Sequence, residues 1–147
     1  SSLILFMINP KKVLFICTGN SCRSQIAEGL LKKMGNRKFE VFSAGSKPSK
    51  LNPHAIQVMK EVDIDISNQS SENINKYLNT GINILITVCD NAQKSCPTFS
   101  EDVIKLHWSV KDPFISWDYD PSQLATFRIT REKIKNKIIH FLKTMES

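Results

Sequence analysis

The sequence predicts an α/β protein in which a four-stranded parallel sheet lies between two layers of helices, as one three-layer domain. Apolar, β-branched stretches alternate along the chain with segments whose apolar residues recur at the helical period. The most apolar stretch, 82–88, has the character of a strand buried on both faces, as in parallel sheets. No repeat, low-complexity tract or Gly/Ser-rich linker divides the 147 residues, a length typical of one domain.

The first half of the chain predicts two strands, each followed by a helix. Residues 12–16 form a buried strand, and 24–34 follow with apolar residues spaced three and four apart. Residues 39–42 form the second strand. An Asn-Pro pair at 52–53 has the residue types preferred at an N-cap and a first helical position, so a helix over 55–61 follows.

The second half repeats the alternation. A short helix is expected near 74–78, and the apolar stretch 82–88 becomes the central strand. Residues 103–108 form the fourth strand. The last helix begins at Asp120-Pro121, and its apolar residues share one face.

The first residues do not look like a targeting or membrane segment. Only six apolar residues follow one another at 3–8, too few to span a membrane, and no basic residue precedes them. We therefore expect residues 1–10 to be an N-terminal extension or a remnant of cloning, with Met7 as the natural start. Residues 11–147 are then a single catalytic domain, and the cytoplasm is the expected compartment.

Charge and cysteine content exclude some classes of function. The net charge of +6 comes from lysines scattered over polar helix faces, without the aromatic stacking groups of a nucleic-acid surface. No nucleic acid or membrane is therefore expected as a partner. Four cysteines in a cytosolic chain indicate catalytic, redox or metal-binding roles more than a disulfide framework.

One loop between a predicted strand and a predicted helix has the composition of an oxyanion site. The strand ends on Cys17, and Arg23 follows five small or polar residues later. Backbone amides and the start of the helix favour negative charge, and the guanidinium of Arg23 adds a bidentate partner. Cys17 is the predicted nucleophile. The predicted oxyanion-binding residues are Thr18, Gly19, Asn20, Ser21, Cys22, Arg23 and Ser24.

Other reactive residues follow neighbouring strands. Cys89 comes after the third strand and Asp112 after the fourth. Ligands of such sheets bind beyond the carboxyl ends of the strands. Topology alone therefore predicts that Cys17, Cys89 and Asp112 lie along one edge of the sheet.

Several motifs occur together and in order between Lys11 and Lys143. They are Phe15-Ile16-Cys17-Thr18-Gly19-Asn20-Ser21-Cys22-Arg23-Ser24, Ser43-Ala44-Gly45, Glu61-Val62-Asp63-Ile64-Asp65-Ile66-Ser67, Val88-Cys89 with Cys96-Pro97, and His107-Trp108 with Asp112-Pro113. In these motifs the chain resembles the low-molecular-weight protein tyrosine phosphatase family. It closely resembles the thioredoxin-coupled arsenate reductase branch of that family.

The resemblance implies a relay of three thiols. Cys17 attacks arsenate while Asp112 protonates the leaving water, Cys89 then attacks Cys17 as arsenite departs, and Cys96 attacks Cys89. Cys89 and Cys96 are seven residues apart, so a helix between them would hold their Cα atoms about 10 Å apart, beyond disulfide reach. We therefore expect residues 90–97 to unwind or loop outward on oxidation and to present the second disulfide to thioredoxin.

The resemblance also implies a potassium ion near the loop and leaves other functions open. Asn20, Glu28 and Ser43 match the potassium positions, and Glu72 stands where an aspartate is usual. No tightly bound cofactor is expected, and the protein is expected to be a monomer. The enzymatic alternative is a low-molecular-weight tyrosine phosphatase using Cys17, Arg23 and Asp112. The non-enzymatic alternative is a redox-sensing or oxyanion-binding module.

Overall fold

The computed structural model describes residues 10–146, which form one four-stranded parallel sheet. The strands are β1 (Lys11–Cys17), β2 (Phe39–Gly45), β3 (Ile84–Thr87) and β4 (Ile104–His107). Their order in the sheet is β2-β1-β3-β4, so β1 has a neighbour on both sides. The predicted fold class is confirmed, and the strand that ends on Cys17 lies inside the sheet.

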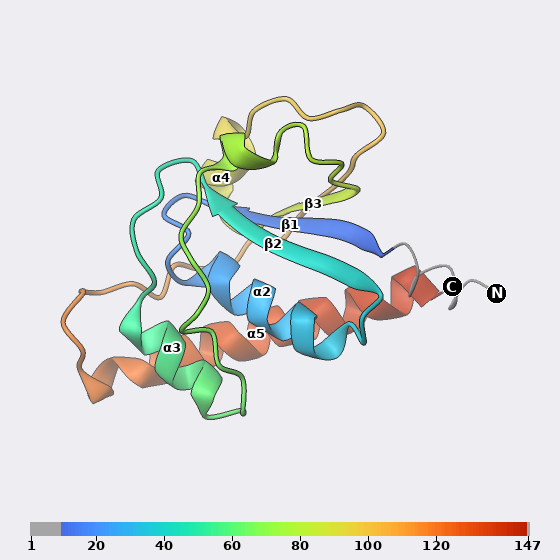
Figure 1. Ribbon diagram of the computed structural model, residues 1–147. Coiled ribbons are helices and arrows are strands. Elements are labelled where there is room, and N and C mark those ends of the chain that lie inside the picture. The colour runs from blue at the N-terminus through green and yellow to red at the C-terminus, as the bar shows by residue number, and fades with distance from the viewer. Residues whose placement is uncertain (1–9, 147) are drawn as a thin grey trace.

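Helices lie on both faces of the sheet, but unequally. The helices α2 (Arg23–Met34), α3 (Pro53–Lys60) and α5 (Leu124–Glu146) lie on one side, and the short helix α4 (Asp90–Ser95) lies on the other (Figure 1). A 3-10 turn, η1 (Ile74–Tyr77), packs its Tyr77 ring against Phe42 of β2. The face under α2 and α5 therefore holds the larger part of the core.

The core explains why these segments fold as they do. Val13 to Ile16 of β1 are fully buried, as expected for a strand covered on both faces. From α5, Phe127, Ile134 and Ile138 are also fully buried, and their spacing places them on one face of that helix. This packing fixes the ends of β1 and α2, between which the predicted oxyanion loop lies.

The main differences from the sequence-based expectation are a change of three residues in the length of a strand or a change in the type of an element. The second strand continues to Gly45, because β1 pairs with it residue by residue as far as Cys17–Gly45. The central strand is shorter than 82–88, since its neighbours pair only with residues 84–87. The last helix opens with a 3-10 turn, η2 (Pro121–Gln123), before α5 begins. The fourth difference, α4, was not expected as a helix and is described with the site.

The predicted N-terminal extension lies largely outside the described residues, and so does the proposed start at Met7. Within residues 10–146, no helix has the length and apolar character needed to cross a membrane.

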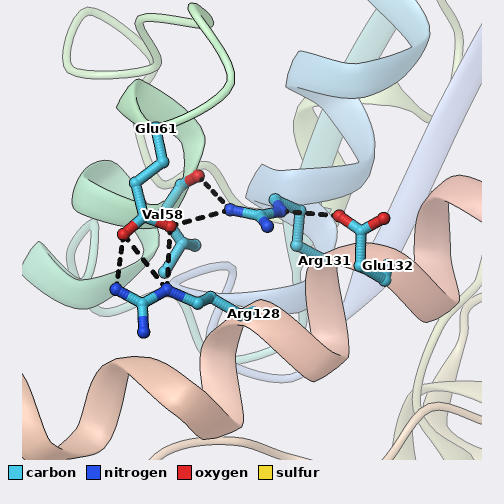
Figure 2. A network of polar contacts seen from close by, with 5 residues as sticks. All are labelled: Val58, Glu61, Arg128, Arg131 and Glu132. Atoms are coloured by element: carbon cyan, nitrogen blue, oxygen red, sulfur yellow. Dashed lines mark hydrogen bonds and ion pairs between the residues drawn. The ribbon is translucent and has the colours of Figure 1, made fainter.

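A network of ion pairs joins the end of α3 to α5 (Figure 2). Glu61, the C-cap of α3, accepts hydrogen bonds from Arg128 at 2.6 Å and from Arg131 at 2.9 Å. Arg131 also donates to the carbonyl of Val58, one of the carbonyls that a helix end leaves without an intrahelical partner. The two arginines, Arg128 first, lower the pKa of the Glu61 carboxyl.

We expect Glu61→Gln to lower the melting temperature by about 2–3 °C at pH 7. The pKa of Glu61 is depressed in the folded state, so its contribution is present above the unfolded value near 4.3 and is lost as the pH falls through the folded value. The difference between the two proteins should therefore shrink in acid. Glu132→Gln, which removes only a contact between neighbours on α5, is the matched control in thermal melts from pH 7 to pH 3.

Candidate active site

The predicted oxyanion loop connects β1 to α2. Cys17 is the last residue of β1 and Arg23 the first of α2, so the loop occupies 18–22 and runs into a helix N-terminus. Asn20 has a positive φ of 49°, a conformation that asparagine tolerates better than most residues. The first amides of α2 and the loop amides other than that of Asn20, which donates to Cys17, are positioned to donate to an anion.

Gly45, at the end of β2, lets the loop approach the sheet. A Cβ at this position would lie 2.3 Å from the carbonyl oxygen of Thr18 and 3.0 Å from the amide nitrogen of Asn20. Both are backbone atoms of the oxyanion loop, so they cannot move without moving the loop.

We expect Gly45→Ala to lower kcat/KM for any oxyanion substrate by about 100-fold, because a displacement near 1 Å in a site is enough to cause such a loss. Gly81→Ala is a control for the loss of a glycine, since a Cβ at that position would meet only Lys12 Nζ at 4.0 Å, although the φ of Gly81 is positive. Steady-state kinetics of both variants give the comparison. A Gly45→Ala enzyme as active as the unchanged protein would show that the loop has room to adjust.

The sulfur of Cys17 accepts hydrogen bonds and is buried. The backbone N–H of Asn20 donates to it at 3.2 Å, and Ser24 Oγ lies 3.0 Å away. The amide group of Asn20 donates to Ser24 Oγ at 2.7 Å, so the hydroxyl proton of Ser24 is free to point at the sulfur. These donors stabilise negative charge on Cys17, the form in which a thiol is a nucleophile.

Arg23 connects the loop to the segment that contains Asp112. One guanidinium nitrogen donates to the carbonyl of Val110 at 2.8 Å, and another lies 3.7 Å from the carboxylate of Asp112. Asp112 accepts a hydrogen bond from the amide of Phe114, and its side chain is 55% exposed. A cavity of about 340 Å³ opens here. It is lined by Cys17, Thr18, Gly19, Ser21, Cys22, Arg23, Asn91, Asp112, Phe114 and Trp117.

Cys89 lies beside this loop and begins α4. Its sulfur is 3.5 Å from the hydroxyl of Thr18, and it accepts the backbone N–H of Ala92 at 3.3 Å as the N-cap of α4. A second cavity contains Cys89, Arg23 and Asp112 among its lining residues. The reactive residues expected along one edge of the sheet therefore lie together.

Cys96 lies at the other end of α4 and does not reach the site. It is the C-cap of α4 and is half-buried, and its thiol contacts the carbonyl of Pro97. Burial raises the pKa of the Cys96 thiol, which Lys105 opposes in part. With α4 formed, Cys89 and Cys96 are separated by the whole helix.

Cys22 differs from the other loop residues. Burial raises the pKa of its thiol to about 12, and the hydrogen bond from Ser21 opposes that shift only in part. Cys22 is therefore a protonated thiol at neutral pH. It has the properties of a structural member of the loop.

The residues expected to hold potassium come together, but they do not form a set of free oxygen ligands. Ser43 and Lys32 donate to the two carboxylate oxygens of Glu28, and the oxygen of the Asn20 side chain accepts the backbone N–H of Glu72. The carboxylate of Glu72 binds Ser70 and Lys76. Two lysines, Lys32 and Lys76, thus already neutralise the acidic members of this set. Within residues 10–146, no group of three or more His, Cys, Asp or Glu side chains is arranged to hold a metal.

Some residues of the site were not expected from the sequence. Lys32 follows Glu28 by four residues on one helix, the spacing at which such pairs form, so the ion pair was open to prediction. Asp90 accepts hydrogen bonds from His107 at 2.9 Å and Ser109 at 3.3 Å, and thereby joins the start of α4 to the end of β4. Nothing in the local sequence indicates these pairs.

Comparison with known proteins agrees with this fold and site. The family model of the low molecular weight phosphotyrosine protein phosphatases matches residues 12–147, so the chain belongs to that family. An arsenate reductase of Oceanobacillus iheyensis is 40% identical over 139 residues, which are 95% of this chain and 100% of that protein. Arsenate reductase 1 of Staphylococcus epidermidis is 48% identical over 134 residues, 91% of this chain and 97% of its own.

Solved structures with the same fold include arsenate reductases. One, described as an arsenate reductase in the phosphate binding state, has a TM-score of 0.71 and 31% identity, and the match covers 91% of this chain and 98% of that one. A thioredoxin-dependent arsenate reductase of Corynebacterium glutamicum has a TM-score of 0.73 and 26% identity, over 94% of this chain and 63% of that one. These similarities confirm the family resemblance found in the motifs.

Proposed function

We propose that this protein reduces arsenate to arsenite by a relay of Cys17, Cys89 and Cys96, and that thioredoxin reduces the final disulfide. The observation that supports this most strongly is the position of Cys89. A phosphatase of this fold needs a nucleophile, an arginine and an acid, whereas here a second thiol lies 3.5 Å from Thr18 of the oxyanion loop. The relatives named as arsenate reductases add support.

In the first step the Cys17 thiolate attacks the arsenic of a bound arsenate. A bond forms between sulfur and arsenic, and the bond from arsenic to a hydroxyl group of the arsenate breaks as Asp112 protonates that hydroxyl, which leaves as water. Arg23 and the loop amides bind the remaining oxygens as charge builds up on them. Asn20 and Ser24 hold the attacking sulfur in place.

In the second step the Cys89 thiolate attacks the sulfur of Cys17. The sulfur–arsenic bond breaks, its electron pair passes to arsenic, and arsenite leaves. Arsenic is reduced by two electrons and the two thiols are oxidised to a disulfide. Cys17 is the last residue of β1 and Cys89 lies two residues beyond β3, and neighbouring parallel strands are about 5 Å apart, a spacing within disulfide reach.

In the third step Cys96 attacks Cys89 and frees Cys17. The two residues cap opposite ends of α4, and a seven-residue helical separation corresponds to about 10 Å between Cα atoms. A disulfide tolerates less than about 7 Å, so α4 must unwind. Only one residue of α4, Ala92, is buried, so little packing opposes this change.

We expect the amides of residues 90–96 to exchange with solvent at least about tenfold faster after one turnover with stoichiometric arsenate. Hydrogen exchange followed by mass spectrometry makes the comparison, with β1 as the internal reference. Cys96→Ser stops at the Cys17–Cys89 disulfide, so exchange in its α4 should rise less than in the unchanged protein, because only the N-cap of the helix is lost. Equal rates in the reduced and oxidised protein would contradict the unwinding step.

The test of the function is a coupled assay with arsenate, thioredoxin, thioredoxin reductase and NADPH. NADPH oxidation should require arsenate and stop when thioredoxin is replaced by glutaredoxin with glutathione. NADPH oxidation that does not depend on arsenate would overturn the proposal. We place the reaction in the cytoplasm, where thiols are kept reduced, and propose that the protein acts as a monomer.

Phosphate-ester hydrolysis is the second candidate function. The cavity above Cys17 has the aromatic side chains of Phe114 and Trp117 in its wall, which suits an aryl phosphate. Phosphate and arsenate share shape and charge, so some hydrolysis is expected of the same loop. A third candidate, a thiol that senses oxidants without turnover, is excluded if the coupled assay produces arsenite at steady state.

A further inference from the structure

We propose that His54 is a positioning residue for the segment that contains the proton donor. We call residues 112–120 the acid loop, because Asp112 is its first residue. The inference rests on the proposed function in one respect, the role of Asp112 as acid. It adds a residue of α3 that neither the relay nor the oxyanion loop includes.

The His54 ring makes a hydrogen bond at each nitrogen. Its Nε2 atom accepts the backbone N–H of Asp120 at 3.0 Å, and its Nδ1 atom lies 3.0 Å from the side-chain oxygen of Asn52. A backbone N–H can only donate, so Nε2 is unprotonated and Nδ1 carries the proton, which it donates to Asn52. The ring is fully buried, so one defined tautomer is held in one orientation.

Two aromatic rings fix the plane of the imidazole. Tyr119 of the acid loop stacks with it at 5.2 Å between ring centroids, with 16° between the planes. Phe127 of α5 also stacks with it, at the same distance and 25°. His54 therefore binds two successive residues of the acid loop, Tyr119 through its face and Asp120 through its edge.

Asn52 links the same histidine to the oxyanion loop. Its side-chain oxygen accepts the His54 backbone N–H at 2.8 Å as well as the ring proton, and its own backbone N–H donates to the carbonyl of Ser21 at 3.1 Å. The side-chain nitrogen of Asn52 is buried without a partner among the described residues. The orientation of the Asn52 side-chain amide thus serves the two hydrogen bonds of its oxygen, and leaving its nitrogen buried without a partner costs free energy.

The acid loop depends on such anchors because it has no helix or strand of its own. Arg23 holds the residues before it through the carbonyl of Val110. Within the loop, Lys50 lies over the ring of Trp117 at 4.8 Å, and Ser116 accepts a hydrogen bond from Gln123. His54 holds its last residues. Without the Asp120 contact, the loop end nearest α5 loses its only hydrogen bond to α3 within the described residues.

The chemical consequence is specific to proton donation. A general acid contributes about 100-fold or more, and it does so only with the donor within hydrogen-bond reach of the leaving oxygen. Its contribution grows as the leaving group becomes more basic. A displaced Asp112 should therefore slow esters with poor leaving groups much more than esters with good ones.

His54→Gln and His54→Asn test this as a matched pair. The side-chain oxygen of glutamine reaches the position of Nε2 and can accept from Asp120, whereas asparagine reaches only the position of Nδ1. We expect His54→Asn to lower kcat/KM for phenyl phosphate about tenfold and for p-nitrophenyl phosphate less than about twofold. His54→Gln should retain most of both rates, and Asp112→Asn gives the limiting loss. The Asp120 amide should exchange with solvent faster in His54→Asn than in His54→Gln.

The outcomes separate the inference from the proposed function. Ester hydrolysis needs Cys17, Arg23 and Asp112 but not Cys89 or Cys96, so a failure of arsenate reduction leaves the test intact. Equal losses for both esters, or equal Asp120 exchange in the two His54 variants, would overturn the positioning role. If the unchanged protein hydrolysed neither ester, the acid–thiolate site itself would be in error, while Asp120 exchange would still decide the His54 contact.

Discussion

Cys89→Ser is expected to abolish arsenate reduction and to leave aryl phosphate hydrolysis within about twofold of the unchanged protein. The serine hydroxyl can replace the hydrogen bonds of the thiol to Thr18 and Ala92, but it cannot form a disulfide with Cys17. The sulfur–arsenic intermediate then has no thiol to attack it. Hydrolysis of a phosphorylated Cys17 uses water in place of a second thiol, so it continues.

Cys96→Ser is the informative companion to this variant. It retains Cys17 and Cys89, so it should produce about one arsenite per protein molecule and then stop. A rapid-quench measurement of arsenite per protein separates zero, one and many turnovers. If Cys89→Ser sustained thioredoxin-dependent reduction, the relay order would be wrong and another thiol would have to take its place.

Cys17→Ser is expected to lower both arsenate reduction and ester hydrolysis by about 10⁴-fold or more, with no comparable loss of stability. The hydroxyl of a serine is a far weaker nucleophile than the thiolate that Asn20 and Ser24 stabilise. Substrate binding should persist, because the loop amides and Arg23 remain. Steady-state kinetics and calorimetric titration with inorganic phosphate measure the two effects separately.

Arg23→Lys is the contrasting variant for binding. Lysine keeps the charge but cannot donate to Val110 and bind an oxyanion through a planar fork at the same time. It should weaken phosphate binding while leaving the reactivity of Cys17 toward iodoacetamide largely in place.

Appreciable turnover in Cys17→Ser would show that a different residue attacks the substrate.

The sequence predicted the order and type of most elements because their apolar patterns are strong. It ended the second strand too early because serine, alanine and glycine have weak strand propensity, and only pairing with β1 extends β2 to Gly45. It gave no helix at α4, because six residues are too few for a periodic pattern. The N-cap of α4 is a sulfur atom whose role depends on the fold.

The sequence placed the site residues that follow from strand order, but not the contacts that depend on the folded structure. The spacing of Cys17 and Arg23 and the strand order were enough to bring the main reactive residues together. The potassium set was inferred from matched positions, without weighing the four-residue spacing of Glu28 and Lys32 that favours their ion pair. The contact of His54 with Asp120 joins residues far apart in the chain, so no local pattern could reveal it.

The sulfur of Cys89 cannot cap α4 and form a disulfide with Cys17 equally well at the same time. In the reduced protein it caps α4 by accepting the N–H of Ala92, and in the reaction the same atom becomes a disulfide sulfur, a poorer acceptor. Losing an N-cap typically costs a helix about 1 kcal/mol, a large share of the stability of so short a segment. Attack on Cys17 would thus weaken the N-cap of α4, the helix that holds Cys96 away from Cys89. In the proposed relay, the second step therefore weakens α4 before Cys96 attacks.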